Sequence, residues 1–222
     1  MTDTKPTILW YRRDLRLSDH SALTAACKRG GPVIAVFIHD DLSDGLGAAP
    51  KWRLGLGVGE LAKTLEEKGS RLILRRGAAL NVLRDLVTET GAGAVYWSRL
   101  YDPDSIARDT AVKETLKADG IEAKSFGGHL MFEPWTVETG SGGFYKVYTP
   151  FWNNVKSRDV DAPLPTPAKI PAPDAWPQSD RLDDWHMGAA MLTHRCRRPP
   201  KSPHLTHGPK ATGWTIGTWG PR

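Results

Sequence analysis

The stretch that decides the fold is Thr7-Ile-Leu-Trp-Tyr-Arg-Arg-Asp-Leu-Arg-Leu-Ser-Asp-His-Ser-Ala-Leu-Thr-Ala-Ala-Cys-Lys-Arg-Gly-Gly31. Residues 7–11 form a short apolar run of strand length, and residues 18–28 carry a helical pattern. Ser18 or Asp19 is the expected N-cap of this helix, and Gly30 lies past its predicted end. A buried strand, an arginine-rich polar loop and a helix together indicate the opening unit of an α/β fold.

The same alternation continues outward from this unit as far as residue 126. Further strands are predicted over 33–38, 72–74, 94–97 and 121–126. Helices are predicted where apolar residues recur every three or four positions, at Leu54, Val58, Leu61 and Leu65 and at Leu80, Leu83 and Val87. A further helix is predicted from Pro103 to Asp119, because proline is typical of a first helical position and Gly120 follows. We therefore expect a doubly wound, Rossmann-like, five-stranded parallel sheet covered on both faces. Such sheets bind ligands beyond the carboxyl ends of their strands.

After residue 126 the regular pattern stops, and three regions are predicted. Residues 1–135 form the α/β domain. Residues 136–186 comprise an aromatic segment, with a helix expected after Pro150, and an extended linker with six prolines in residues 162–177. Residues 187–222 form an irregular tail, which we expect to be disordered because it lacks acids and hydrophobic periodicity.

Composition excludes several classes of protein. The 222 residues are 40% hydrophobic and 9% aromatic, which is typical of a globular chain rather than a disordered one. No apolar run approaches the roughly 18 residues of a membrane span, and no secretory signal is visible, so we expect a cytoplasmic protein. Cys27 and Cys196 give no disulfide framework.

The charge is unevenly distributed along the chain. The formal charge is +5, but residues 187–222 hold six basic residues and no acid, so residues 1–186 carry 24 basic against 25 acidic groups. A neutral body predicts little or no specific binding of DNA. The tail's His194, Cys196, His204 and His207 match the spacing of no zinc module, and no metal site is predicted.

Two features have both a structural and a functional interpretation. The loop after the first strand is either an internal corner, in which Asp14 pairs with a neighbouring arginine, or an anion site in which Arg12 or Arg13 faces the ligand. Trp52 either covers the sheet or stacks on a ligand ring.

The alternating Gly55, Gly57 and Gly59 lie within a helical pattern and predict close helix packing, not a dinucleotide fingerprint. Similarly, Thr139 to Gly143 predicts a surface turn, not a phosphate loop.

Three ordered motifs resemble the DNA photolyase and cryptochrome family. They are Trp10-Tyr-Arg-Arg-Asp-Leu-Arg-Leu-Ser-Asp-His-Ser-Ala-Leu23, Tyr96-Trp-Ser-Arg-Leu-Tyr-Asp-Pro-Asp-Ser-Ile-Ala-Arg-Asp109 and Thr139-Gly-Ser-Gly-Gly-Phe-Tyr-Lys-Val-Tyr-Thr-Pro-Phe-Trp152. The resemblance runs from about residue 7 to residue 185.

The resemblance implies a light-driven DNA repair chemistry. In this family an α/β antenna domain is joined by a linker to a helical domain that holds FAD. Excited reduced flavin passes an electron to a cyclobutane pyrimidine dimer flipped out of DNA, and the dimer splits. A second pigment in the α/β domain, a folate or a deazaflavin, passes absorbed energy to the flavin.

The resemblance also implies where the second pigment binds. Its candidate contacts are Arg12, Arg13, Asp14, Arg53, Ser98, Tyr101, Asp102, Asp104 and Ser105. Folate-binding members carry Asn-Glu where this chain has Asp104-Ser105, so the usual folate contact is altered, and the deazaflavin pattern is not matched cleanly either. The resemblance assigns no catalytic residue to this chain. The electron-relay tryptophans of the family belong to the helical domain.

The sequence departs from the family at its carboxyl end. The resemblance fades after about Met191, and we expect the helical FAD domain to be absent, as a shifted reading frame would produce. Three functions stay open: a photolyase antenna domain that is inactive in repair alone, a stand-alone pigment- or nucleotide-binding module, and a truncated product without function. We expect Trp10, Trp97 and Trp135 in the core, and association through apolar surface exposed on the aromatic segment and linker.

Overall fold

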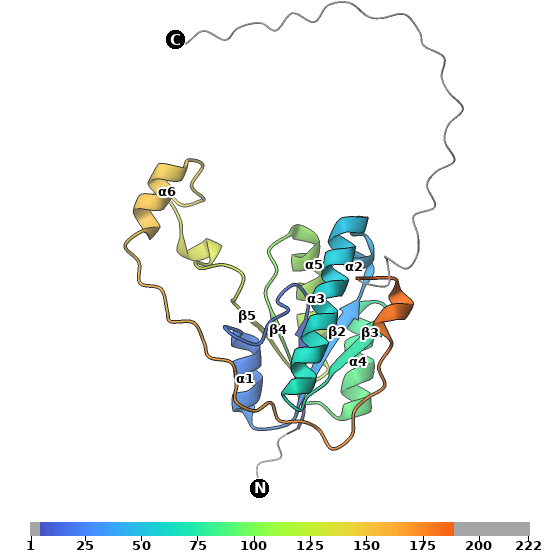
Figure 1. Ribbon diagram of the computed structural model, residues 1–222. Coiled ribbons are helices and arrows are strands. Elements are labelled where there is room, and N and C mark those ends of the chain that lie inside the picture. The colour runs from blue at the N-terminus through green and yellow to red at the C-terminus, as the bar shows by residue number, and fades with distance from the viewer. Residues whose placement is uncertain (1–4, 189–222) are drawn as a thin grey trace, which may run out of the picture.

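The five predicted strands form one parallel sheet (Figure 1). The computed structural model describes residues 5–188. The strands are β1 (Thr7–Tyr11), β2 (Val33–His39), β3 (Leu72–Arg76), β4 (Ala94–Ser98) and β5 (Glu122–Phe126). Their order is β3-β2-β1-β4-β5, and every neighbouring pair is parallel. The predicted doubly wound sheet is confirmed, and the strand order reverses between β1 and β4.

The crossover helices also lie where the sequence predicts them. They are α1 (Ser21–Arg29), α3 (Ala48–Glu67), α4 (Ala79–Thr90) and α5 (Pro103–Ala118). The short α2 (Asp41–Asp44), capped by the side chain of Asp40, was not predicted because four residues show no periodicity. Two 3₁₀ turns, η1 (Pro134–Thr136) and η2 (Leu182–Trp185), follow the domain. Helix α6 (Tyr148–Val155) begins before Pro150, not after it, because proline is tolerated in a helix's first turn.

The N-cap predicted for α1 is wrong. The cap is His20, whose Nδ1 accepts the backbone N–H of Leu23 at 3.1 Å. Asp19 instead adopts a left-handed conformation, and its carboxylate accepts the backbone N–H of Leu164 from the distant linker. The local preference of aspartate for caps is therefore overridden by a tertiary contact.

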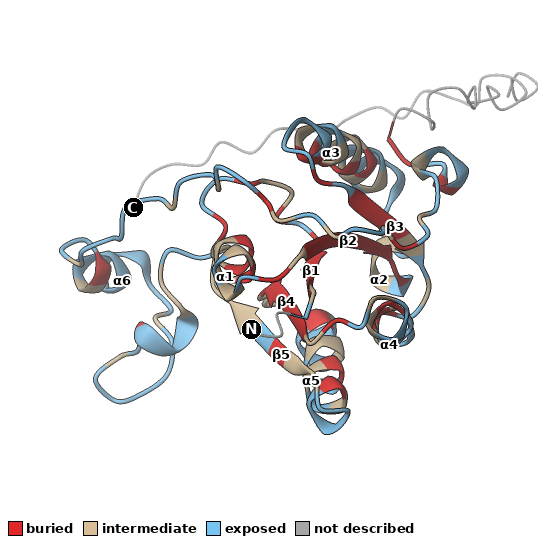
Figure 2. Ribbon diagram, turned by 90° about the horizontal axis from the view of Figure 1, so that it is seen from below, coloured by how far each residue is buried: buried red, intermediate tan, exposed pale blue. Residues whose placement is uncertain are grey.

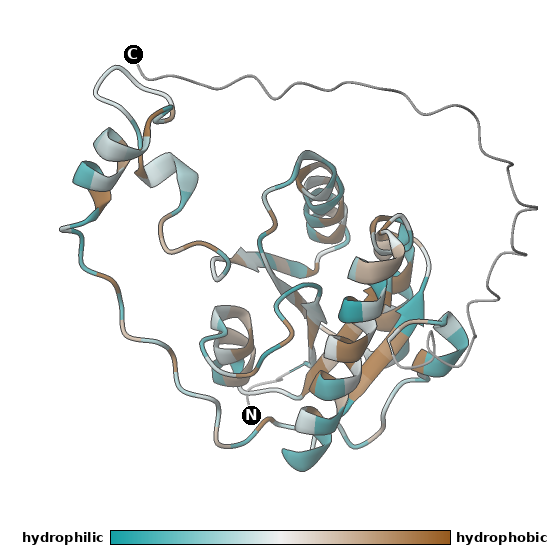
Figure 3. Cartoon of the chain, turned by 45° about the horizontal axis from the view of Figure 1, so that its top comes forward, coloured by the Kyte–Doolittle hydropathy of each residue, from teal (hydrophilic) through white to brown (hydrophobic). Residues whose placement is uncertain are grey.

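The two faces of the sheet bury different sets of side chains, as alternation along strands requires. Leu9, Ala35 and Phe37 point toward α1 and α3, whereas Trp10, Val36 and Trp97 point toward α4 and α5. Figure 2 shows the inner strands as almost fully buried, and Figure 3 shows their hydrophobic character. Trp10 and Trp97 are core residues as predicted, but Trp135 is 58% exposed, because η1 lies beyond the sheet.

Glycines in α3 permit close packing, as predicted. A Cβ at Gly55 would lie 2.2 Å from the backbone nitrogen of Gly188, and one at Gly57 would lie 2.8 Å from Leu15 Cδ1. A Cβ at Gly59 would make only an ordinary contact, 3.6 Å from Leu182 Cδ2. Each glycine lowers helix propensity by about 1 kcal/mol relative to alanine, so this half of α3 depends on its packing.

The proline-rich linker packs against the α/β domain. We call residues 164–188 the strap; in Figure 1 it passes beneath the domain and climbs the β3 side. The backbone N–H of Val33 donates to Pro171 O, and that of Asp180 donates to Leu74 O on the edge strand β3. Ile170, Trp185 and Met187 of the strap are buried with the α1–α3 side of the core. The linker is extended as predicted, but it is docked along this length.

Residues 129–160 form an arm that projects from the sheet (Figure 1). Most of its large apolar side chains are exposed, namely Leu130, Met131, Trp135, Phe144, Val147, Tyr148, Phe151, Trp152 and Val160. Thr139–Gly143 is an exposed turn closed by its own backbone hydrogen bonds, as predicted. Exposed apolar surface therefore lies on the arm rather than on the strap.

Within residues 5–188, no helix is long and apolar enough to cross a membrane. The interpretation of residues 189–222 as a disordered tail, and of their histidines and Cys196 as non-ligands, lies outside the described residues. Met187 and Gly188, which were assigned to that tail, are buried against α3.

Candidate functional site

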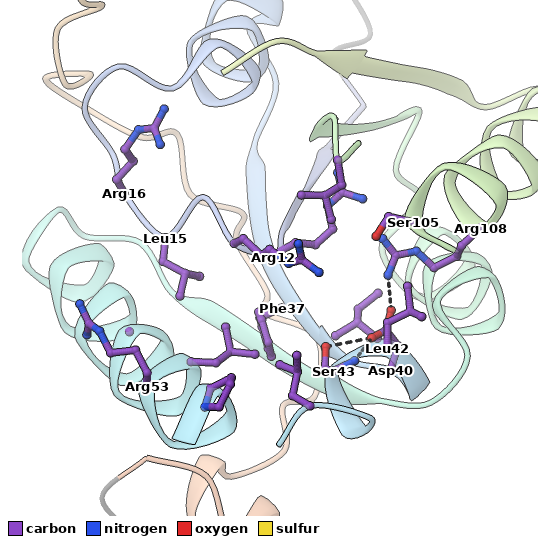
Figure 4. Close-up of a pocket in the computed structure, with 17 residues that line it drawn as sticks. Arg12, Leu15, Arg16, Phe37, Asp40, Leu42, Ser43, Arg53, Ser105 and Arg108 are labelled. Atoms are coloured by element: carbon purple, nitrogen blue, oxygen red, sulfur yellow. Dashed lines mark hydrogen bonds and ion pairs between the residues drawn. The ribbon is translucent and has the colours of Figure 1, made fainter. Parts of the chain in front are cut away.

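The main cavity of the described chain lies at the carboxyl edge of the sheet, where ligands of such folds bind. Its volume is about 550 Å³. Figure 4 shows Arg12 and Phe37 at its centre, α3 on one side and α5 on the other. Its apolar wall comes from β2, α2, the loop between α2 and α3, and α3, which supply Phe37, Ile38, Leu42, Leu46 and Leu54.

Arg12 is held in place by partners from two other elements. Its side chain is 6% exposed, its Nη1 lies 2.5 Å from Asp109 Oδ2 on α5, and its Nη2 donates to the carbonyl of Ser98 at the end of β4. Burial lowers the pKa of the Arg12 guanidinium, while Asp109 opposes this effect. The guanidinium also lies 4.6 Å from the centroid of the Trp10 ring. Each terminal nitrogen of Arg12 thus has a partner within the protein, whereas its buried Nε has none among the described residues.

Arg108 and Asp40 form a second fixed pair on the cavity wall (Figure 4). Arg108 Nη1 lies 2.5 Å from Asp40 Oδ2, and Arg108 Nη2 lies 2.8 Å from Asp109 Oδ1. Asp109 therefore bridges the guanidiniums of Arg12 and Arg108. The predicted site did not include Asp40, Arg108 or Asp109, although Arg108 and Asp109 stand within the second quoted motif.

Three further arginines lie on the cavity rim with weaker partners or none. Arg13 Nη1 is 3.4 Å from Asp102 Oδ2, and both side chains are more than one third exposed. Arg16 donates to the backbone carbonyls of Asp19 and Gly128. Arg53 has no ion pair or hydrogen bond within residues 5–188. Positive charge without a carboxylate partner is therefore concentrated at Arg16 and Arg53, which fits an anionic group on a ligand.

The structure brings only part of the predicted site together. Arg12, Arg13, Arg53 and Ser105 line the main cavity. Asp104 instead lines a smaller cavity of about 300 Å³ on the far side of Asp40 and Arg108. Asp14, Ser98, Tyr101 and Asp102 line neither of the two cavities. Trp52 is 36% exposed and is also outside the lining and both core clusters.

Asp14 supports the loop from behind, but its partner is not the expected arginine side chain. Its Oδ1 accepts the backbone N–H of Arg12 at 3.0 Å, and its Oδ2 lies 2.8 Å from His20 Nε2. Burial alone would raise the pKa of Asp14, but the contact with His20 and further hydrogen bonds lower it well below its usual range. The corner is internally paired as one interpretation predicted, through a histidine that also caps α1.

The depressed pKa predicts an acid-labile corner. A carboxylate whose pKa is lower in the folded state stabilises the protein above its unfolded pKa of about 4, and this contribution is lost as the pH falls toward the folded value. We expect the free energy of unfolding, measured by urea denaturation from pH 6 to pH 2.5, to fall more steeply for wild type than for Asp14→Asn. Parallel curves for the two proteins would contradict this assignment.

Tyr101 and Asp102 serve the surrounding framework. Tyr101 donates to Glu133 Oε2 at 2.7 Å, and Arg99 donates to Glu133 Oε1 at 2.6 Å, which fastens the base of the arm to the β4 loop. Burial and Glu133 raise the pKa of Tyr101. Asp102 caps α5 by accepting the backbone N–H of Ser105 at 3.1 Å. These contacts position the loop without facing the cavity.

The chemistry of this cavity is that of binding. An apolar wall accepts a ring system, and the arginine rim accepts an anionic group. Within the part of the chain that is described, no cluster of histidine, cysteine and carboxylate side chains is suited to a metal ion.

Comparisons with known proteins agree with this architecture. The family model for DNA photolyase matches residues 7–171. A deoxyribodipyrimidine photo-lyase of Agrobacterium fabrum is 46% identical over 185 residues, covering 83% of this chain and 39% of the relative. The crystal structure of a bacterial class III photolyase from Agrobacterium tumefaciens superposes with a TM-score of 0.80 at 46% identity, covering 83% of this chain and 39% of that one.

An archaeal photolyase from Sulfolobus tokodaii is a more distant structural match. Its TM-score is 0.67 at 28% identity, over 81% of this chain and 40% of that chain. That structure is described as containing two FAD molecules, with the implication of a novel light-harvesting cofactor. The present chain thus spans about two fifths of the length of these photolyases. With a matching family model over most of its length, the chain belongs to the DNA photolyase family.

Proposed function

We propose that this chain is a light-harvesting module that holds a pigment in the cavity between α3 and α5. The observation that carries the proposal is the position of the cavity at the strand-order reversal, with an apolar wall and arginines at its rim. The pigment would absorb light and pass the energy on. The work of the protein's own residues is to bind, orient and desolvate the ring.

The cavity fits a pigment of the folate or flavin type. Its volume of about 550 Å³ lies within the usual range for small-molecule sites. Phe37, Leu54 and Leu42 would contact the ring, while Arg16 and Arg53 would hold an anionic tail. A folate and a deazaflavin both combine a ring with an anionic or polar tail. The second FAD of the archaeal relative makes a flavin the third compound to test.

The first experiment identifies the pigment. The purified chain is examined by absorption spectroscopy, and released small molecules are identified by mass spectrometry. Stripped protein is then titrated with methenyltetrahydrofolate, a 5-deazaflavin and FMN, with quenching or polarisation of the pigment's fluorescence as the signal. Saturable binding of one of them supports the module. A colourless protein that binds none of the three would favour a product without function.

Gly57→Leu should abolish pigment binding. Gly57 lies in the cavity wall, and its new side chain would displace Leu15 into the space that the ring needs. We expect at least a hundredfold weaker binding, corresponding to about 2.7 kcal/mol, with unchanged far-ultraviolet circular dichroism. Gly59→Ala is the control on the same helix, because Gly59 does not line the cavity and its new methyl group would make only an ordinary contact, 3.6 Å from Leu182 Cδ2, so binding should be unchanged. Equal affinities of the two variants would place the pigment elsewhere.

Repair of DNA is assigned to a larger assembly. The photolyases that match are more than twice as long as this chain, and we propose that binding of damaged DNA and flavin-driven splitting of the lesion require the part that the match does not span. Residues 1–186 are nearly neutral, which supports weak DNA binding by the module itself.

The arm should make the isolated chain self-associate. Tyr148 and Trp152 stack at 6.3 Å between ring centroids and are respectively 69% and 48% exposed, beside further exposed apolar groups. We expect concentration-dependent association at micromolar protein in sedimentation velocity. The double variant Tyr148→Ser/Trp152→Ser should be mainly monomeric. Wild-type protein that stays monomeric up to 100 micromolar would contradict this expectation.

A further inference from the structure

The end of the strap and the main cavity lie on opposite sides of the same segment of α3. We propose that docking of the strap and occupation of the cavity stabilise each other through residues 48–58 of α3. Pigment binding would therefore also stabilise the strap end, residues 182–188, against local opening. The coupling to a pigment rests on the proposed function. The mechanical link, which is the packing of the strap end against α3, does not depend on a bound pigment.

The strap side of the link is tightly packed. An added Cβ at Gly55 would lie 2.2 Å from Gly188 N and 2.7 Å from Met187 Cβ, so the strap backbone lies directly against the helix. Trp185 and Met187 are both buried in the same cluster as Val58 of α3. Movement of this part of α3 must therefore disturb the strap end.

The cavity side of the link uses neighbouring residues of the same helical turns. Arg53, Leu54 and Gly57 line the cavity, on either side of Gly55 in the sequence. Phe37 provides a second connection, because it lines the cavity and its ring centroid lies 6.2 Å from that of Trp185. Figure 4 shows Phe37 near the centre of the pocket, between Leu15 and Ser43.

The segment between these two sides is intrinsically weak. It contains Gly55 and Gly57 and is followed directly by Gly59, and its N-cap, Gly47, offers no side-chain hydrogen bond. Its helical conformation consequently depends on what packs against it. Two binding events that order the same weak element favour each other, and the coupling is reciprocal.

Amide hydrogen exchange of the pigment-free protein tests the mechanical link. Trp185→Ala removes the strap's largest contact with the cluster, and we expect exchange of residues 48–58 to become at least about tenfold faster, since exchange reports local opening. Trp176→Ala is the matched control, because Trp176 belongs to the same strap but packs on the α4–α5 side of the sheet. Leu182→Ala, a smaller truncation next to Gly59, replaces Trp185→Ala if that variant does not fold. Unchanged exchange in α3, or equal acceleration by the control, would overturn the proposal.

Titration with FMN, a 5-deazaflavin and methenyltetrahydrofolate tests the coupling. The bound pigment should slow exchange of residues 182–188, and Trp185→Ala should weaken its binding by about fivefold or more, the lower end of typical allosteric coupling. Equal affinity in wild type and Trp185→Ala would reject the coupling while leaving the pigment site intact. Failure of wild type to bind any of the three would reject both the pigment site and its coupling, leaving only the exchange result.

Discussion

Gly55→Ala should lower the free energy of unfolding by about 3 kcal/mol, the upper end of the cost of overpacking. The new methyl group would lie 2.6 Å from Met187 C and 2.2 Å from Gly188 N, and these are backbone atoms that cannot rotate away. The protein must either shift α3 or release the strap end with its buried Trp185. For a chain of this size the midpoint of thermal unfolding should fall by about 6–12 °C.

Gly59→Ala is the control for this prediction. Both substitutions add the same methyl group to the same helix and raise its helix propensity by up to about 1 kcal/mol. The new group at position 59 would meet only Leu182 Cδ2, at 3.6 Å, so this variant should be as stable as wild type or more so. Destabilisation by both variants, or by neither, would show that the close approach of the strap to α3 is not what Gly55 provides.

Asp109→Asn should cost about 3 kcal/mol, because removal of one partner from a buried ion pair leaves the other charge without compensation. Arg12 is 6% exposed and Asp109 is 13% exposed, so water cannot replace the lost carboxylate. Arg108 loses the same partner and keeps Asp40 as its remaining ion pair within residues 5–188. We expect the loss in urea denaturation at neutral pH, together with weaker pigment binding, since both guanidiniums line the cavity.

Asp119→Asn makes the same chemical change at an exposed pair. Asp119 Oδ2 lies 2.7 Å from Arg84 Nε, and their side chains are 35% and 49% exposed. Pairs of this kind contribute little to stability because water screens them, so stability should barely change. If the two variants were equally destabilised, the burial of the Asp109 pairs would not be the cause.

Such results would mean that the same ion pairs stabilise the fold and shape the cavity. The side chains that hold the cavity open are also the ones that join β1, the α2 region and α5 across the sheet edge. The proposed pigment site is preorganised, because Arg12 and Arg108 are held by carboxylates without a ligand. Arg16 and Arg53, which have no carboxylate partner within residues 5–188, are then the groups left to respond to the ligand's charge.

Most of the fold follows from local patterns. The apolar runs at residues 7–11 and 33–38 predict strands buried on both faces, since only a covered parallel sheet tolerates such continuity. Helix spacing predicts which side of α3 and α4 is buried, and Gly30 and Gly91 end α1 and α4 in left-handed conformations, where glycine carries no steric penalty.

The candidate site was only partly predictable. Arg12 stands out because it follows a central strand, and Arg53 because it lies near the start of a helix at the same edge. By contrast, Arg12 pairs with a residue 97 positions away and Arg108 with one 68 positions away. No local rule selects Asp109 and Asp40 among 25 acidic residues. Nor does a local rule predict that His20, rather than Ser18 or Asp19, caps α1.

The sequence by itself determined the sheet, its helices and the family, because these depend on periodic burial and on short motifs that a linear pattern records. Only the tertiary structure decided that the proline-rich segment is a strap, that the arm carries the exposed apolar surface, and which carboxylates fix the cavity arginines. The physical reason is that such contacts depend on which distant segments the crossovers bring together. Their energy comes from burial and charge pairing that arise only in the folded chain.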